Sequence, residues 1–141
     1  MVEVTAEQAI AKIRSNEAQV NQLNNQIRTV VQTLEALGAT RITLDQMPDA
    51  ETEGLAPIGG VFLPIKANAT TIKVDVGAGV VVDKTRMEAV EMLKKREELL
   101  QKDIERLQAL GRVINTESNE IKKKLMEAQQ AQQPDVPVIS G

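Results

Sequence analysis

Several residue types that commonly act in catalysis or bind transition metals are missing from this chain of 141 residues. It contains no His, Cys, Tyr or Trp, and its one aromatic residue is Phe62. Zinc and copper sites, thiolate nucleophiles and imidazole bases are therefore excluded, and no Ser or Lys has a base and an orienting partner that the sequence identifies. We expect no catalytic residue, no cofactor site and no metal site, and hence a protein that is not an enzyme.

A few short patterns resemble functional motifs, but each has a simpler structural explanation. The Gly-Ala-Gly run at residues 77–79 lacks the remaining spacing of a phosphate loop and suits a hairpin turn. The Asn-Ala-Thr triplet at residues 68–70 matches the glycosylation sequon, although such triplets are common by chance. The basic runs at residues 94–96 and 122–124 have acidic neighbours and are typical of solvated helix faces.

The charge balance and the hydropathy pattern exclude further classes of partner. The chain has 17 Lys and Arg against 20 Asp and Glu, a net charge of −3. We expect no nucleic-acid partner, because neutralising phosphates requires a basic surface. No apolar run reaches the roughly 18 residues of a membrane span, and the first residues lack the charged-then-apolar order of a signal peptide. The absence of Cys fits a reducing compartment, so we expect a cytoplasmic protein without a membrane partner.

A long coiled-coil helix is predicted for residues 1–37, with regular helix from residue 5, because no Gly or Pro occurs between residues 5 and 37. Thr5 and Gln8 form a capping box at its start, and Gly38 follows at a position where a left-handed residue ends many helices. Apolar residues recur at alternating steps of three and four, the a/d spacing of a heptad. The predicted seam contains Ile10, Ile13, Val20, Ile27, Val31 and Leu34, with interruptions at Glu17 and Asn24 and a second apolar line of Leu23, Val30 and Leu37 beside it.

The same spacing predicts a second coiled-coil helix over residues 85–128. Thr85 and Glu88 form its capping box. Neither helix would be stable alone in water, so each apolar stripe must be covered by another helix. Residues 129–141 are rich in Gln and broken by Pro, and we expect a flexible tail there. The seam contains Val90, Leu93, Leu100, Ile104, Leu107, Ile114, Ile121 and Leu125, with interruptions at Glu97, Gly111 and Ser118.

Residues 38–84 have the pattern of an oligomerisation region built from β-hairpins. Short β-like runs at residues 41–44, 61–65, 71–76 and 80–82 are separated by turn-like residues, and residues 45–55 are predicted to form a polar loop. Four short strands with one aromatic residue cannot close a stable core. The strands must therefore pair with strands of other chains.

The order of the elements predicts how the two helices run. A hairpin starts and ends at the same edge of its sheet, so two hairpins return the chain to the place where it left the first helix. The helices are therefore expected to run antiparallel, seam against seam, with both termini far from the hairpins. The predicted fold class is α+β, a long antiparallel two-helix coiled coil joined by two β-hairpins.

This pattern, over nearly the whole chain, resembles the α-class subunits of the prefoldin family. The most specific segments are residues 57–64 (Pro-Ile-Gly-Gly-Val-Phe-Leu-Pro) and residues 74–84, which look like the hairpins of that family. The presence of two hairpins, where β-class subunits have one, points to the α class. Family members often have an aromatic residue just after the second pair of glycines, whereas this chain has Val80 and Val81, which keep the β propensity.

The resemblance implies an ATP-independent molecular chaperone without a cofactor. Two α-class and four β-class subunits would form a hexamer whose hairpins build an inter-subunit β-barrel. Unfolded polypeptide would be held at the tips of the coiled coils and delivered to a group II chaperonin. The residues expected at the subunit interface are Ile42, Leu44, Val61, Phe62, Leu63, Ile72, Val74, Val76, Val80 and Val82.

Client binding at the tips would use flexible Met and aliphatic side chains, which adapt to varied partners. Ile10 and Leu125 also continue the predicted seams, where packing inside the coiled coil is the simpler explanation. The alternative function is a structural coiled-coil protein that oligomerises through its hairpins and binds no client. The candidate client-binding residues are Met1, Val2, Val4, Ile10, Leu125 and Met126.

Overall fold

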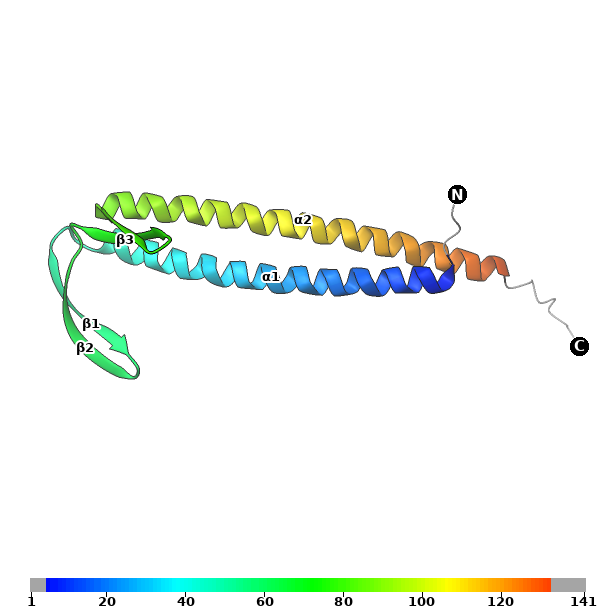
Figure 1. The fold of residues 1–141 in the computed structure, drawn as a ribbon, viewed down its shortest axis with the longest axis horizontal. Helices are drawn as coiled ribbons and strands as arrows, with labels where there is room; N and C mark the ends of the chain where they lie inside the picture. Colours follow the sequence, from blue (N-terminus) through cyan, green and yellow to red (C-terminus); the bar gives the residue numbers. More distant parts are fainter. Residues whose placement is uncertain (1–4, 133–141) are drawn as a thin grey trace, which may run out of the picture. The chain divides into compact units, whose positions relative to one another are not determined.

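The computed structural model describes residues 5–132 and contains two long helices joined by two β-hairpins (Figure 1). Strand β1 pairs with β2 and β3 pairs with β4, each pair antiparallel and each a separate two-stranded sheet. The α+β fold with an antiparallel helix pair and two hairpins is confirmed. No helix within the described residues has the length and hydropathy that a membrane span requires. In chain order the elements are α1 (Ala6–Gln46), β1 (Glu51–Ile58), β2 (Val61–Asn68), β3 (Ile72–Gly77), β4 (Val80–Lys84) and α2 (Arg86–Gln132).

Both helices begin at the predicted capping boxes. At the start of α1 the Gln8 amide donates to Thr5 Oγ1 at 3.2 Å, and the Thr5 amide donates to Gln8 Oε1 at 3.1 Å. At the start of α2 the Glu88 amide donates to Thr85 Oγ1 at 3.1 Å, and the Thr85 amide donates to Glu88 Oε1 at 3.4 Å. Each box satisfies two backbone donors at a helix start, where intrahelical partners are missing. Residues close in sequence are therefore enough to determine where both helices start.

Helix α1 continues to Gln46, so the predicted helix end at Gly38 and the predicted strand over residues 41–44 are wrong. Thr40 and Thr43 lie inside the helix, and their hydroxyls donate to the carbonyls four residues earlier, at 3.0 and 2.9 Å. Their hydroxyls are thus satisfied without leaving the helical conformation. Gly38 instead lies close to α2, because a Cβ at this position would lie 3.1 Å from Glu97 Oε1.

The C-terminal end of α1 is capped by a residue of α2. Arg86 donates through Nη1 to the carbonyls of Leu44 and Asp45, both at 3.2 Å. These carbonyls belong to the last helical turn, where the Leu44 carbonyl also accepts from the Met47 amide at 3.3 Å, and Pro48 follows where the helix can no longer continue. Arg86 also donates through Nε to Asp49 Oδ1 at 2.8 Å. This hydrogen bond, with a smaller contribution from the positive charge of Arg86, lowers the pKa of Asp49 below its ordinary value.

Five of the six apolar residues predicted for the seam of α1 are half-buried, namely Ile13, Val20, Ile27, Val31 and Leu34. Ile10 was predicted to lie in the seam but is 45% exposed. Two apolar lines run side by side along α1, and packing against α2 buries the line that passes through Leu23. The buried residues of α1 are Ala9, Asn16 and Leu23, and half-buried Ile13, Val20, Ile27, Val30, Leu34 and Leu37 complete the three-four spacing.

The predicted seam of α2 is confirmed, and two of its interruptions have polar partners on α1. Asn16 Nδ2 donates to Ser118 Oγ at 3.0 Å, and this contact is buried. Arg41 Nε donates to Glu97 Oε2 in a part-buried ion pair. Because the later residue of α1 contacts the earlier residue of α2, the two helices run antiparallel. The buried apolar seam residues of α2 are Val90, Ile104, Leu107 and Ile114.

The chain forms two compact units. One unit is built from the part of α1 up to Thr29 and the part of α2 from Asp103 onward, and it contains the Asn16–Ser118 contact. The other unit is Val30–Lys102, which contains both hairpins and the ion pair between Arg41 and Glu97. In each unit the core is the aliphatic seam between the two helices.

Glycines with positive φ make both hairpin turns. Residues 59–60, both Gly, have φ of 54° and 83° and form the two-residue turn between β1 and β2. Positive φ at both central residues is the requirement of a type I′ turn, whose backbone twist matches that of the strands. Residues 77–79 also have positive φ, and Asp75 Oδ1 accepts a hydrogen bond from the Gly77 amide at 2.8 Å. The prediction of a hairpin turn at residues 77–79 is confirmed.

Strand β1 lies where residues 45–55 were predicted to be a polar loop, so that prediction is wrong from Glu51 onward. Glu51 pairs with Asn68 and Glu53 pairs with Lys66, and all four side chains are exposed. Polar residues on an exposed strand face give no hydrophobic alternation, so the sequence pattern did not distinguish this strand from a loop. At the other end of the chain, α2 continues to Gln132, beyond the predicted start of the tail at residue 129, and residues 133–141 lie outside the described residues.

Candidate functional site

Exposed apolar side chains cover both faces of the β1–β2 hairpin. Residues that pair across antiparallel strands share a face, so one face carries the pair Pro57 and Phe62 and the other carries the pair Ile58 and Val61. Phe62 is 66% exposed. A two-stranded hairpin with two apolar faces cannot bury both of them against one layer. We call its exposed large apolar residues the assembly surface, and they are Leu55, Ile58, Val61, Phe62, Leu63 and Ile65.

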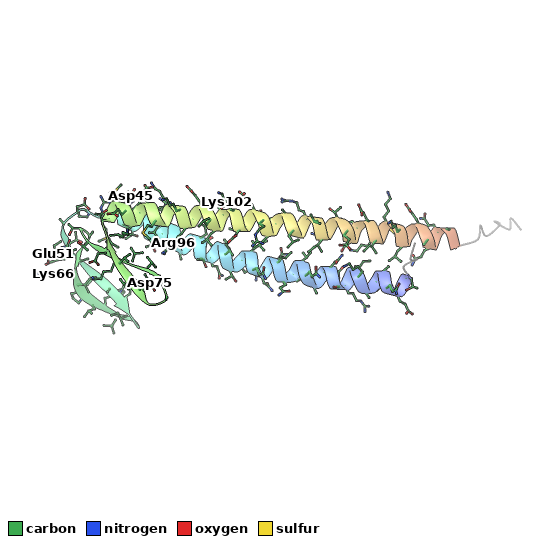
Figure 2. The ribbon with its side chains drawn as sticks, turned by 45° about the horizontal axis from the view of Figure 1, so that its top comes forward. Asp45, Glu51, Lys66, Asp75, Arg96 and Lys102 are labelled. Atoms are coloured by element: carbon green, nitrogen blue, oxygen red, sulfur yellow. The ribbon has the colours of Figure 1, made fainter. Side chains whose placement is uncertain are left out.

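The β3–β4 hairpin forms a hydrogen bond with α2 and has both half-buried and exposed apolar side chains. Arg96 Nη2 of α2 donates to the Asp75 carbonyl of β3 at 3.2 Å, and Figure 2 shows both residues. Lys73 and Asp83 form an exposed cross-strand ion pair at 3.0 Å, which contributes little to stability. The half-buried apolar residues of this hairpin are Ile72, Val74 and Val82, and the exposed ones are Val76, Val80 and Val81.

The structure divides the predicted interface residues among three elements. Val61, Phe62 and Leu63 belong to the assembly surface of the β1–β2 hairpin. Ile42 and Leu44, which were predicted to lie on a strand, are part of α1. Ile42 is exposed and Leu44 is half-buried. The remaining predicted interface residues lie on the second hairpin and are Ile72, Val74, Val76, Val80 and Val82.

The predicted interface omitted three members of the assembly surface, Leu55, Ile58 and Ile65. Ile65 was left out although it lies in the run at residues 61–65 that was predicted to be a strand. Leu55 and Ile58 were missed together with strand β1, because Leu55 was assigned to a loop. One signal in the sequence would have identified it. A Gly-Gly pair at residues 59–60 with apolar residues on both sides is a strong indication of a two-residue hairpin turn.

The predicted client-binding residues are only partly described by the structure. Ile10 on α1 and Met126 on α2 are exposed, at 45% and 61%. Leu125 is half-buried and lies in the seam of α2. Ile10 and Met126 belong to the same compact unit. Met1, Val2 and Val4 lie outside the described residues.

Comparisons with known proteins agree with this architecture. The family model described as "Prefoldin subunit" matches residues 9–133. The chain is 32% identical over 120 residues to the protein named prefoldin subunit alpha from Methanosarcina barkeri, covering 77% of this chain and 83% of the relative. It is 33% identical over 110 residues to the protein of the same name from Methanococcoides burtonii, covering 74% of this chain and 79% of the relative.

A solved structure has the same fold. The crystal structure of the prefoldin beta subunit from Thermococcus strain KS-1 matches 91% of this chain and 96% of that chain, with a TM-score of 0.65 and 17% sequence identity. At this identity the likeness concerns the fold alone. The family model spans most of the chain, and the curated relatives carry the name of one subunit class. This chain therefore belongs to the prefoldin family, as a subunit of the α class.

Proposed function

We propose that this chain is a subunit of an ATP-independent chaperone that assembles through its hairpins and holds unfolded polypeptides. The observation that carries the proposal is the assembly surface, an apolar surface on both faces of a two-stranded hairpin that the described residues leave exposed. An isolated hairpin is marginally stable in water, and exposed apolar patches of this kind are typical of protein interfaces. Membership of the prefoldin family supports the role of a chaperone subunit.

The proposed assembly is a hexamer with a second α-class subunit and four β-class subunits, joined through an inter-subunit β-barrel. Phe62 is two-thirds exposed, and burying its side chain would contribute about 2 kcal/mol by area. Five further large apolar side chains of the same surface would add contributions of similar size. Their sum, roughly 10 kcal/mol, is comparable with the entropy that association costs, which is estimated at about 4–15 kcal/mol.

Client capture is proposed at the end of the coiled coil that contains the start of α1 and the end of α2. Ile10 and Met126 are exposed there, and the proposal extends to Met1, Val2, Val4 and Leu125. Flexible Met and aliphatic side chains can repack against different unfolded segments. The captured polypeptide would be delivered to a group II chaperonin without nucleotide hydrolysis.

The test of the proposal mixes this chain with a β-class prefoldin subunit. Light scattering should give the mass of a defined hexamer, and the mixture should suppress aggregation of a chemically denatured client protein without ATP. A mixture that remains monomeric would contradict the proposed assembly. A hexamer that forms but gives no protection would favour the alternative of a scaffold protein without client binding.

A matched pair of variants locates the client site. The double substitution Ile10→Ser and Met126→Ser removes exposed apolar side chains at the proposed site. The control is Val113→Ser, because Val113 lies on α2 away from its ends and is exposed to a similar extent, 65% against 61% for Met126. We expect the double variant to lose client protection several-fold while the control retains it, with hexamer formation unchanged in both. Equal loss in both variants would contradict a site at the helix ends.

A further inference from the structure

The methionines are the side chains of this chain that a peroxide oxidises most readily. The sequence has five Met and no Cys, so no thiol competes for the oxidant. Met126 and Met87 are exposed, at 61% and 50%, whereas Met47 and Met92 are half-buried. Met1 lies outside the described residues. Among the described methionines, the two exposed ones should therefore react first.

Met126 lies at the end of the coiled coil where client capture is proposed. The start of α1 and the end of α2 lie side by side there (Figure 1), and Lys122 Nζ lies 3.8 Å from Glu17 Oε1 across the two helices. Exposed Ile10 belongs to the same compact unit as Met126, and Met87 belongs to the other unit. The two exposed methionines of α2 are thus similar in exposure and differ in position.

The side chains around Met126 can accept a more polar product. Residues three and four positions away share its face of the helix, and they are Lys122, Lys123, Gln129 and Gln130. All four are exposed, and each has N–H donors and no carboxylate. A thioether sulfur is a weak acceptor, whereas a sulfoxide oxygen is polar and can accept from such donors or from water. Oxidation at this position should therefore leave α2 folded.

Oxidation of Met126 changes what the helix end offers to a client. The thioether side chain is flexible and apolar and can repack against different unfolded segments. The sulfoxide must give up its hydrogen bonds before an apolar segment can cover it, which makes capture less favourable. Residues 48–86 contain no Met, so the same reaction leaves both hairpins and the assembly surface unmodified.

We infer that Met126 is a reversible oxidation site through which a peroxide lowers client capture without dissolving the assembly. The sulfur of Met126 donates an electron pair to one peroxide oxygen, the O–O bond breaks, and the remaining oxygen leaves as an alcohol or as water. The sulfur is oxidised to the sulfoxide and the peroxide is reduced. A methionine sulfoxide reductase reverses the step with a dithiol, which becomes a disulfide as water is released. The inference rests on the proposed function, because it names a regulation of the proposed client site.

Peroxide treatment of this chain, followed by its assembly with an untreated β-class prefoldin subunit, tests the inference. Peptide mass spectrometry should show Met126 and Met87 oxidised before Met47 and Met92. Light scattering should give the same hexamer mass, while the concentration that halves client aggregation rises about threefold or more. Reductase with dithiothreitol should restore the original concentration. Slower oxidation of Met126 than of the half-buried methionines would overturn the inference.

Two leucine variants supply the matched comparison. Met126→Leu and Met87→Leu each keep an apolar side chain of similar volume, so both should protect clients as well as the wild type before oxidation. After oxidation, Met126→Leu should retain its protection and Met87→Leu should lose it as the wild type does. Met1 is present in both variants, so an effect of its oxidation would appear equally in both. Equal losses in the two variants would overturn the inference.

The untreated assembly separates failure of this inference from failure of the proposed function. An untreated hexamer that gives no protection would contradict the proposed function and the inference together. An untreated hexamer that protects, with equal protection after complete conversion of Met126, would overturn the inference and leave the proposed function intact. Dissociation of the hexamer on oxidation would also overturn the inference, because it places the effect on capture alone.

Discussion

The buried contact between Asn16 and Ser118 allows a quantitative test of the coiled coil. Asn16 is 1% exposed and Ser118 is 5% exposed, and the Asn16 amide donates to the Ser118 hydroxyl at 3.0 Å. Ser118→Ala leaves the amide buried without this acceptor, which should destabilise the chain by about 1–3 kcal/mol. Replacing both residues, by Asn16→Leu with Ser118→Ala, leaves no polar group in this layer. The double variant should be at least as stable as the wild type, because apolar pairs replace buried polar pairs at little or no cost.

The assay is urea unfolding followed by circular dichroism, with all four chains of the double-mutant cycle at one concentration. The coupling energy between the two positions should be about 1 kcal/mol or more. The second expected result concerns specificity, because a single buried polar layer fixes the register of a coiled coil. Light scattering should therefore show more self-association in the double variant than in the wild type. A Ser118→Ala variant with unchanged stability, or additive single effects, would refute the reasoning.

Further predictions concern the two glycines inside the helices and the cap of α1. Gly111→Ala should raise stability by about 0.5–1 kcal/mol, because Ala is the better helix former and its Cβ meets no atom within 4 Å. Gly38→Ala should gain less stability than Gly111→Ala, because its Cβ would lie 3.1 Å from Glu97 Oε1. Thermal unfolding of both variants measures the two gains. In a Glu97→Ala background the two gains should become equal, and equal gains in the wild-type background would contradict this contact. The pKa of Asp49, measured by NMR titration, should lie below its ordinary value and rise in Arg86→Ala. The pKa of Asp49 is lower in the folded chain than in the unfolded chain. The contact with Arg86 therefore stabilises the fold at pH values above the unfolded pKa of about 4, and this stabilisation is lost as the pH falls through the folded pKa.

Much of the fold followed from patterns that involve only neighbouring residues. The capping boxes at Thr5 and Thr85 were predictable because each one joins groups three residues apart. The seam of α2 was predictable because its apolar residues form one clear line. The seam of α1 was predictable only in part, because Ile10 and Leu23 belong to neighbouring apolar lines, and the structure buries Leu23 and leaves Ile10 exposed. The assembly surface was predicted in part. Phe62 was expected at the subunit interface, whereas Leu55 was missed because strand β1 was not predicted.

The sequence by itself determined where the helices start, where the hairpins turn, and that two amphipathic helices must cover each other. These features depend on backbone preferences and on periodicity within a few residues of chain. Only the tertiary structure decided that residues 41–44 are helical and that the polar residues in the seams are paired. Arg41 meets Glu97 and Asn16 meets Ser118 across distances in sequence that no local pattern spans. Folding alone brings these side chains together, and a buried polar group needs such a partner, so the physical reason for each pairing lies in the tertiary structure.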